Sequence, residues 1–425
     1  MRAIRASTAV LALLCLMYFI THLDRVNVST AADGFAPEFG LNRTQIGLVF
    51  SGFAYPYLVF QIIGGWVSDR FGARRTLLVS AGVWAVATAL TGMAVGLYSL
   101  LAARVLLGLG EGATFPAATA AMSRWVPAPR RGFAQGITHA AARSGNAAAP
   151  WLVVQVMLAY NWRWSFYFCA AVSFLWVALW ALAFTEHPGA HPRITREELA
   201  ALPVAGIAPR DVPWGPLFRR MMPVTIVYFC YGWTLWLFLS WIPQYFLHSH
   251  GLDLRKSALF SSVVFCAGVI GNTLGGFVTD GLLARTASLQ RARSGMVAVC
   301  MGLSLLSLVP LLLSHDVYVC LVALGAGFLF AEMTIGPMWA IPMDVAPQFS
   351  GTASGMMNTG SAMAAILSPV VSGALIDRFG SWELPFAGSM VLMSCGVLLA
   401  FRMRPGDRFG EPAAADPAAV AGTRA

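Results

Sequence analysis

The chain has 425 residues, of which 58% are hydrophobic and only 11% are charged. Soluble globular domains carry about 25% charged residues, so the composition excludes a soluble enzyme and indicates an integral membrane protein. The formal net charge of +9 does not point to a nucleic-acid partner. The basic residues instead gather in the connections on one predicted side of a membrane.

Twelve apolar segments of about 20 residues, long enough to span a bilayer, follow one another along the chain. They are continuous rather than alternating, which favours helices over a membrane β-barrel. We expect an all-α fold of two six-helix halves, residues 1–185 and 220–403, with a proline-rich linker at 186–219 and a disordered tail at 404–425. The predicted spans are 8–32, 44–68, 76–96, 98–122, 133–158, 163–185, 220–247, 257–280, 294–313, 316–340, 351–376 and 383–403.

Most of the 28 Arg and Lys residues lie in connections that share a side with the N-terminus. Such an excess marks the cytoplasmic side, so both termini are predicted to be cytoplasmic. Arg2 and Arg5 precede the first apolar run as in a secretory signal, but no small-residue cleavage site follows, and we expect an uncleaved first span. Within the linker, Thr195 is expected to cap a short surface helix.

Residues 102–116 form an apolar helical segment that nevertheless contains Arg104 and Glu111. Seven residues are almost two helical turns, so both side chains point to the same side. An ionisable group at bilayer depth costs at least about 2.5–3.5 kcal/mol and usually faces a bundle interior or a water-filled cavity. The pair is interpreted as part of a functional site, and the alternative is a buried structural ion pair.

A glycine-rich pattern occurs twice, at residues 64–70 and at 275–281. Two parallel repeats place a binding site near the bilayer midplane, where the halves meet. Glycine allows close helix approach, and Asp69 can accept hydrogen bonds from a neighbouring helix N-terminus. In the second copy Gly281 replaces the arginine, so this copy is expected to be weaker. The full first motif comprises Gly65, Asp69, Arg70, Gly72, Arg74 and Arg75.

This motif resembles the loop motif of the major facilitator superfamily, which acts as a conformational latch. Three further segments resemble the anion:cation symporter branch of that superfamily, which includes galactonate, hexuronate and glucarate carriers, sialin and vesicular glutamate carriers. They are His22-Leu23-Asp24-Arg25-Val26-Asn27, Arg104 with Glu111 and Phe115-Pro116, and Arg143-x-Gly145 with Ala149-Pro150.

The resemblance implies that Asp24 and Glu111 carry protons, that Arg25 contacts the substrate carboxylate, and that Arg104 tunes the two acids. It also implies that Asn358 binds substrate. The chain departs from the galactonate carriers in two places, because Ala142 replaces a glutamine and His22 replaces a tyrosine. Both changes lie where substrate would be recognised, so galactonate itself is in doubt.

Five other residues have two interpretations each. Arg143 is a second anion clamp, or it snorkels or pairs with an acid. His22 is a proton relay or a packing residue. Glu332 is a third titratable site or the ion partner of an arginine in the first or fourth span. Tyr231 and Trp236 line the substrate cavity, or they belong to the core or face lipid.

Burial favours the protonated form of a carboxylate, while a nearby arginine favours its charged form. Such an acid can load a proton on one side of the membrane and release it on the other. Arginine remains charged and grips a carboxylate with two parallel hydrogen bonds. These properties favour a proton-coupled symporter that imports a small organic anion, such as a hexonate, hexuronate or hexarate, by alternating access.

Two other transport functions are weighed. One is proton-driven drug efflux, but the fifth span lacks the glycine-rich GPxxGG stretch of drug exporters and carries Arg143. The other is uptake of an aromatic or dicarboxylic acid. A receptor would need an additional signalling domain, and an enzyme would need a metal cluster, an activated nucleophile or a phosphate loop.

The predicted partners are therefore a small organic anion, protons and membrane lipid, with no nucleic acid. No cofactor and no metal is assigned. We expect a monomer in a bacterial-type inner membrane.

Overall fold

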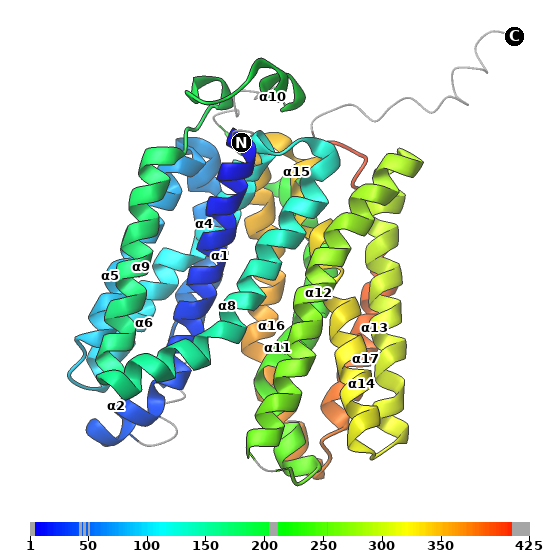
Figure 1. Cartoon of the computed structure of the whole chain (residues 1–425). Helices are drawn as coiled ribbons and strands as arrows, with labels where there is room; N and C mark the ends of the chain where they lie inside the picture. Colours follow the sequence, from blue (N-terminus) through cyan, green and yellow to red (C-terminus); the bar gives the residue numbers. More distant parts are fainter. Residues whose placement is uncertain are drawn as a thin grey trace, which may run out of the picture.

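The computed structural model describes residues 5–41, 45, 48–49, 52–203, 211–252 and 254–409. These residues form helices and connections without strands, in agreement with the predicted all-α fold. Within this part, nine helices are long and apolar enough to cross a membrane by length and composition. The helices form two bundles that lie side by side, and the described part of the chain begins and ends on the same face, which we call the terminal face (Figure 1).

The N-terminal bundle corresponds to the first six predicted spans. Its helices are α1 (Ala6–Thr30), α2 (Ala32–Glu38), α4 (Ala54–Phe71), α5 (Ala73–Gly92), α6 (Leu97–Gly112), α7 (Thr114–Trp125), α8 (Arg131–Ala159) and α9 (Trp162–Ala183). The predicted spans at 44–68 and 133–158 become α4 and α8. Arg131, His139 and Arg143 make α8 more polar than a typical membrane helix.

The C-terminal bundle contains the other six spans. Its helices are α11 (Trp214–Gln244), the π-helix η3 (Tyr245–Ser249), α12 (Leu254–Thr286), the π-helix η4 (Gln290–Gly295), α13 (Met296–Leu313), α14 (Val317–Glu332), α15 (Ile335–Val345), α16 (Ser350–Phe379) and α17 (Leu384–Ala400). The helix α11 therefore begins before residue 220, where the span was predicted to start.

The fourth and tenth spans are each broken into two helices. The first break lies at Ala113, between α6 and α7, and the second lies between α14 and α15. Pro116 and Pro337 each occupy the first turn of the helix after the break. Proline is tolerated there because the backbone N–H that it lacks would have no partner within the helix. Each of these spans is therefore interrupted in its middle.

The two bundles meet along α4 with α16 and along α8 with α12. Glycine is required at these crossings. A Cβ atom on Gly65 would lie 2.2 Å from the carbonyl oxygen of Gly351, and one on Gly136 would lie 2.4 Å from that of Asn272. Small residues of this kind allow helix backbones in a membrane to approach closely. The contact between the halves therefore depends on backbone proximity.

The linker packs on the terminal face. Its helix α10 (Arg196–Ala201) is capped by Thr195, whose hydroxyl accepts from the backbone N–H of Glu198 at 3.2 Å, as predicted. The expected disordered tail begins too early at 404. The N–H of Phe409 donates to the carbonyl of Val345 at 2.7 Å, so residues up to 409 pack on the C-terminal bundle. The remaining tail, 410–425, lies outside the described residues.

Candidate functional site

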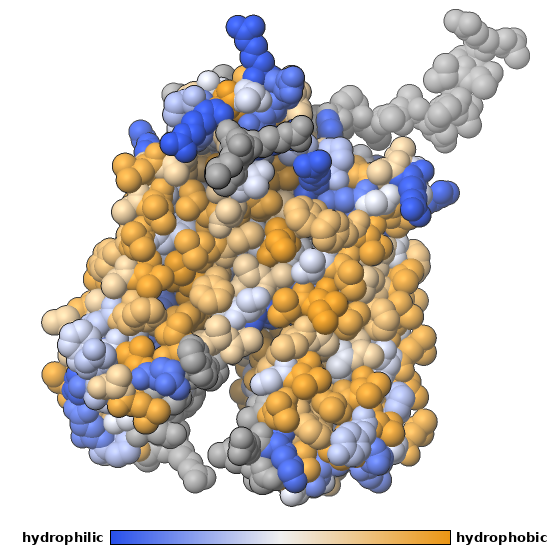
Figure 2. Space-filling model, in the orientation of Figure 1, coloured by the Kyte–Doolittle hydropathy of each residue, from blue (hydrophilic) through white to orange (hydrophobic). Residues whose placement is uncertain are grey.

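The surface is hollowed between the two bundles at the end away from the termini, and the bundles close on each other toward the terminal face (Figure 2). Most of the ionisable residues predicted within the spans are buried in the interior of the bundles. The site is described below from these residues outward.

Arg25 on α1 and Glu111 on α6 form the first ion pair. The Nε atom of Arg25 lies 2.6 Å from Glu111, and the glutamate side chain is fully buried while that of Arg25 is 16% exposed. The Arg25 guanidinium also lies over the rings of Tyr57, Phe53 and Phe115, at 4.7, 4.9 and 5.2 Å. The sequence predicted that these residues would converge, but it placed Glu111 with Arg104.

This pair is incompletely hydrogen-bonded. Among the described residues, the Nη2 atom of Arg25 and the Oε1 atom of Glu111 are buried and have no hydrogen-bond partner. Buried polar groups are normally paired, because an unpaired one costs roughly 1–3 kcal/mol. Free donor and acceptor capacity at a buried charge is therefore typical of a site that takes a ligand or a proton.

Arg104 and Asp24 point to different surroundings. Arg104 donates from Nε to the carbonyl of Val49 at 3.2 Å, and its guanidinium shares the ring of Phe53 with Arg25, at 5.4 Å. Asp24 faces the interior of the N-terminal bundle, where it accepts from Thr88 at 3.4 Å and Ser173 at 3.3 Å. One oxygen of Asp24 has no partner among the described residues.

Arg143 on α8 and Glu332 on α14 form a second buried ion pair, which joins the two halves. Two nitrogens of Arg143 bind the two oxygens of Glu332, at 3.1 and 3.2 Å. Tyr231 donates to Glu332 at 2.9 Å, and Asn272 donates at 2.6 Å. Glu332 had two interpretations, a third titratable site or the ion partner of an arginine in the first or fourth span, and the structure shows an ion pair with a different arginine. It partners Arg143 of the fifth instead, because α8 packs along the C-terminal bundle.

Asn358 on α16 also connects the halves, since it donates to Gln61 of α4 at 2.8 Å and to Tyr57 at 3.4 Å. His22 is buried, and its Nδ1 atom lies 3.0 Å from the carbonyl oxygen of Tyr18. Trp236 is half-buried, and its buried indole nitrogen has no hydrogen-bond partner among the described residues.

Sequence reasoning missed an aromatic cluster that lies between the two ion pairs. Phe115 contacts the rings of His139 and Trp339, both at 6.2 Å, and Trp339 donates to the hydroxyl of Tyr228 at 2.7 Å. Tyr228 in turn stacks on Tyr231 at 5.3 Å. The cluster thus extends from Phe115, which contacts Arg25, to Tyr231, whose hydroxyl binds Glu332. Because its members are distant in sequence, only the fold brings them together.

The latch motif lies on the terminal face. Asp69, near the end of α4, accepts from the backbone N–H groups of Gly351 at 2.9 Å and Thr352 at 2.6 Å, in the first turn of α16. A carboxylate at a helix N-terminus meets unpaired N–H groups and the positive end of the helix dipole. Asp69 therefore ties the two halves together as its sequence context suggested.

The other motif residues shape the turn between α4 and α5. Gly72 lies in this turn with φ +91°, a backbone conformation that favours glycine. Close to this turn, the carboxylate of Glu186 accepts a hydrogen bond from the backbone N–H of Arg74 at 2.8 Å. The Arg74 guanidinium donates to the carbonyl of Ala181. Arg70 and Arg75 are exposed on the terminal face.

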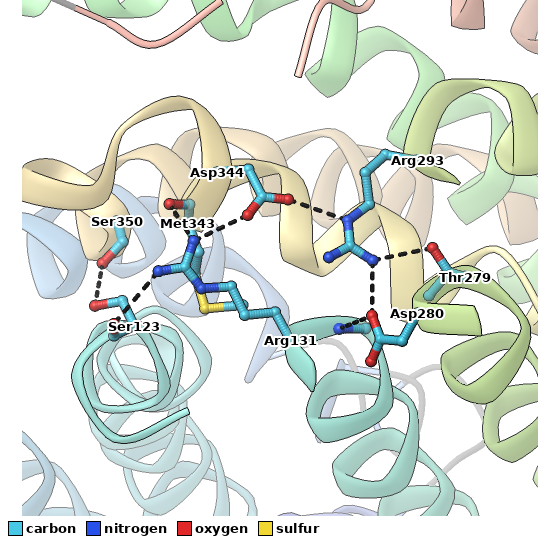
Figure 3. A network of polar contacts seen from close by, with 9 residues as sticks. Ser123, Arg131, Thr279, Asp280, Arg293, Met343, Asp344 and Ser350 are labelled. Carbon is cyan, nitrogen blue, oxygen red and sulfur yellow. Dashed lines mark hydrogen bonds and ion pairs between the residues drawn. The ribbon is translucent and has the colours of Figure 1, made fainter. Parts of the chain in front are cut away.

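The second copy of the motif forms a more extensive network than the first, so the expectation of a weaker latch is wrong (Figure 3). Asp280 accepts from the N–H groups of Gly132 at 3.1 Å and Phe133 at 2.7 Å, at the start of α8. Arg293 of η4 binds Asp280 at 3.1 Å and Asp344 at 3.0 Å. Arg293 thus supplies the positive charge that Gly281 lacks, from a separate helix.

Asp344 extends this network across the halves, because Arg131 of α8 binds it at 2.9 Å. Ser350 also donates to Ser123 of α7 at 3.1 Å (Figure 3). The terminal face is thus closed by several polar contacts between the bundles, while the opposite end is open.

A family model described as the Major Facilitator Superfamily matches residues 14–369. The chain belongs to this superfamily. Its relatives in the superfamily include the probable sulfoacetate transporter of Cupriavidus necator, which is 44% identical over 407 residues covering 95% of each chain. The hexuronate transporter of Bacillus subtilis is 30% identical over 406 residues, which cover 94% of this chain and 93% of the relative.

The fucose:proton symporter of Escherichia coli, a solved structure of the superfamily, has a TM-score of 0.72 with 17% sequence identity. The alignment covers 94% of this chain and 99% of the symporter, so the predicted fold of two six-helix halves is confirmed. The relatives and this neighbour are transporters. The family match and the two relatives, which are named as transporters of organic anions, confirm the prediction of an integral membrane transporter of anions and not an enzyme.

Proposed function

We propose that this protein is a proton-coupled symporter that imports a small organic anion by alternating access. Arg25 and Arg143 bind the acid groups of the anion, and Asp24 and Glu111 carry protons. Arg104 sets the electrostatic environment of these acids, and it lies on the same aromatic ring as Arg25.

One observation carries this proposal: a buried carboxylate, Glu111, holds Arg25 at 2.6 Å, while one oxygen of Glu111 and one nitrogen of Arg25 have no hydrogen-bond partner in the part of the chain that the structure describes. When Glu111 takes up a proton, its attraction for Arg25 falls, and the guanidinium becomes available to a substrate acid. A proton and an anion can then enter the site together. Release of the proton restores the ion pair and favours release of the anion.

The orientation follows from charge. Arg70, Arg74, Arg75 and Arg131 lie on or beside the terminal face, and an excess of basic residues marks the cytoplasmic side. We therefore place both termini in the cytoplasm of a bacterial-type cell. In this orientation the hollow of Figure 2 opens outward, and the contacts of Asp69 and Asp280 hold the cytoplasmic side shut.

The substrate class is drawn from the relatives. Their names specify sulfoacetate and hexuronate, and both are small organic acids. Sulfoacetate is our first candidate, because the relative named for it is 44% identical over 95% of both chains. Sugar acids form the second group.

Uptake into proteoliposomes tests the function. With labelled sulfoacetate, or with a hexonate, hexuronate or hexarate, an acidic exterior should stimulate accumulation by the wild-type protein. Asp24→Asn and Glu111→Gln should abolish that stimulation, because neither side chain can then carry a proton. Glu197→Gln, an exposed change on α10, is the matched control and should behave like the wild type. Equal accumulation with and without a proton gradient would refute proton coupling.

A further inference from the structure

Glu332 and Glu111 occupy equivalent positions in the two halves. Each lies at the end of the first helix of a broken span, α6 in one half and α14 in the other. Each also precedes a proline by five residues, Pro116 in one case and Pro337 in the other. Each carboxylate holds one arginine, Arg25 or Arg143. The two acids thus share helix context and chemistry, although only Glu111 has a role in the function proposed above.

The second pair differs in one respect: it crosses between the halves. Arg25 and Glu111 both belong to the N-terminal bundle, whereas Arg143 lies in that bundle and Glu332 in the other. Any movement of one bundle against the other leaves the first pair intact but changes the second. The charge on Glu332 is therefore directly linked to the relative position of the halves.

The helix α14, which carries Glu332, packs closely against α12. A Cβ atom on Gly271 of α12 would lie 2.2 Å from the carbonyl oxygen of Leu329 and 3.2 Å from Cβ of Glu332, so the two helices are in contact there. The charged and titratable neighbours are Arg143 of α8 and Tyr231 and Tyr228 of α11. The helix α13 carries no acidic or basic residue.

These neighbours suit both protonation states of Glu332. Asn272 donates its amide N–H to the carboxylate, and its amide oxygen is buried without a hydrogen-bond partner among the described residues. The hydroxyl of Tyr231 can donate or accept. Protonated Glu332 can therefore donate from Oε1 to Tyr231, while Asn272 continues to donate to Oε2 and to the carbonyl of Gly268.

We propose that Glu332, like Glu111, is a proton-carrying acid that holds an arginine, and that it is an internal competitor for the transported anion. In the substrate-free protein, the carboxylate of Glu332 binds the two guanidinium nitrogens of Arg143 that would otherwise bind an acid group of the substrate. A proton from the open side forms an O–H bond on Glu332, the ion pair with Arg143 breaks, and Arg143 binds the anion. This inference rests on the proposed function and deepens it.

The substrate class and the stoichiometry follow. Two arginines, each released by its own acid, accept two acid groups, so the site is suited to a small dianion whose binding adds one proton to Glu111 and one to Glu332. The charge taken up is then zero. A substrate with one acid group would leave either Arg25 or Arg143 held by its glutamate, and it would bind with one proton.

Proton counting tests the inference. Titration calorimetry of the purified wild-type protein with sulfoacetate, in buffers of different ionisation enthalpy, gives the protons taken up per anion. We expect about two protons for the wild type and about one for Glu332→Gln. The affinity of the wild type for sulfoacetate should rise as the pH falls. The slope of the logarithm of this affinity against pH should be smaller by about one proton in Glu332→Gln. At pH 8 the variant should bind sulfoacetate at least about tenfold more tightly than the wild type, because its neutral amide competes less for Arg143.

Two controls separate the outcomes. Sulfoacetamide keeps the size of sulfoacetate but has one acid group, and it should bind the wild type with about one proton. Glu197→Gln should give wild-type proton numbers. If acid-driven uptake depends on Glu111 but Glu332→Gln keeps the wild-type proton number, this inference is wrong and the proposed function stands. One proton per sulfoacetate in the wild type would overturn it without any variant. If the wild type binds neither sulfoacetate nor the sugar acids, both proposals fail.

Discussion

Arginine is the residue on which the site depends, and lysine would not replace it. Arg25 combines a hydrogen bond to Glu111 with contacts of its planar guanidinium to three aromatic rings. A guanidinium stacks on rings and binds a carboxylate or sulfonate through two parallel N–H groups, whereas an ammonium is a compact, strongly hydrated charge. The position therefore selects geometry as well as charge.

Arg25→Lys should accordingly weaken substrate binding while retaining the positive charge. We expect the KM for uptake to rise by about tenfold or more, corresponding to about 1.4 kcal/mol lost at the guanidinium. Transport assays across substrate concentrations would measure this. Arg285→Lys, at the exposed end of α12, is the control and should leave KM unchanged. A wild-type KM in Arg25→Lys would exclude direct binding by this residue.

Single residues were predictable from sequence to different degrees. Exposing an arginine or an acid to the lipid within an apolar span is costly, so Arg25, Glu111 and Arg143 could be expected in the bundle interior. Their partners could not be assigned, because pairing depends on how α1 packs against α6 and how α8 faces α14. One signal was available but unused: Glu111 and Glu332 each precede a proline by five residues in equivalent spans.

At the scale of helices, acidic side chains from other segments cap the N-termini of three helices. Asp69 caps α16, Asp280 caps α8, and Glu198 of the linker caps the first turn of α1. Each carboxylate meets backbone N–H groups that have no partner within their own helix. The same physical device therefore joins the two halves and fixes the linker.

Glu198 gives a prediction about pH. Its burial opposes ionisation, but hydrogen bonds from the hydroxyl and N–H of Ser7, at 2.5 and 2.7 Å, and from the N–H of Ala6, at 3.3 Å, outweigh burial and lower the pKa of Glu198. A lowered pKa means that the charged form stabilises the fold above the ordinary glutamate pKa of about 4.3, and that this stabilisation is lost as the pH falls below it.

Glu198→Gln should therefore reduce stability at pH 7 by about 1 kcal/mol, as for the loss of a helix cap. Thermal unfolding in detergent at several pH values would measure the difference from the wild type, which should narrow as the pH falls below about 4. The neighbouring Glu197→Gln should have little effect, because Glu197 is exposed. A difference that stayed constant down to pH 3 would argue against the charge of Glu198 as the cause.

Helices themselves were predicted well, since their bounds follow from long apolar runs. The second latch was not. Its positive charge comes from Arg293, which lies beyond α12 in the π-helix η4, so the local comparison of Gly281 with Arg70 was misleading. Any helix that packs nearby can supply such a charge, and a comparison of local motifs does not include residues from other helices.

For the whole molecule, the structure is one of the two arrangements that the proposed alternating-access mechanism requires. The bundles are tied at the terminal face and separated at the other end (Figure 2). Under this proposal, transport to the terminal side requires the contacts of Asp69, Asp280 and Asp344 across the halves to break. Sequence repetition indicated two halves and a site between them, but not which end is closed.

Cross-linking across the terminal face should stop transport. The hydroxyl oxygens of Ser123 and Ser350 lie 3.1 Å apart on opposite halves, so cysteines at these positions would bring their sulfur atoms near each other, as a disulfide requires. Oxidation of the Ser123→Cys, Ser350→Cys double variant should abolish uptake, and a reductant should restore it. Each single variant, which retains the native cysteines, serves as the control. Unimpaired uptake by the fully cross-linked protein would show that these helices need not separate.

The contacts of Glu198 have a practical consequence for dividing the chain. They fasten α10 to the start of α1, within the N-terminal bundle, so the connecting segment belongs structurally to that bundle as far as Ala201. A gene cut between the codons for Pro203 and Asp211 would leave this fastening in the first polypeptide. Two polypeptides produced together in one cell should then reassemble. A cut ahead of Thr195 would instead leave α10 on the second polypeptide, separated from the start of α1 that it caps.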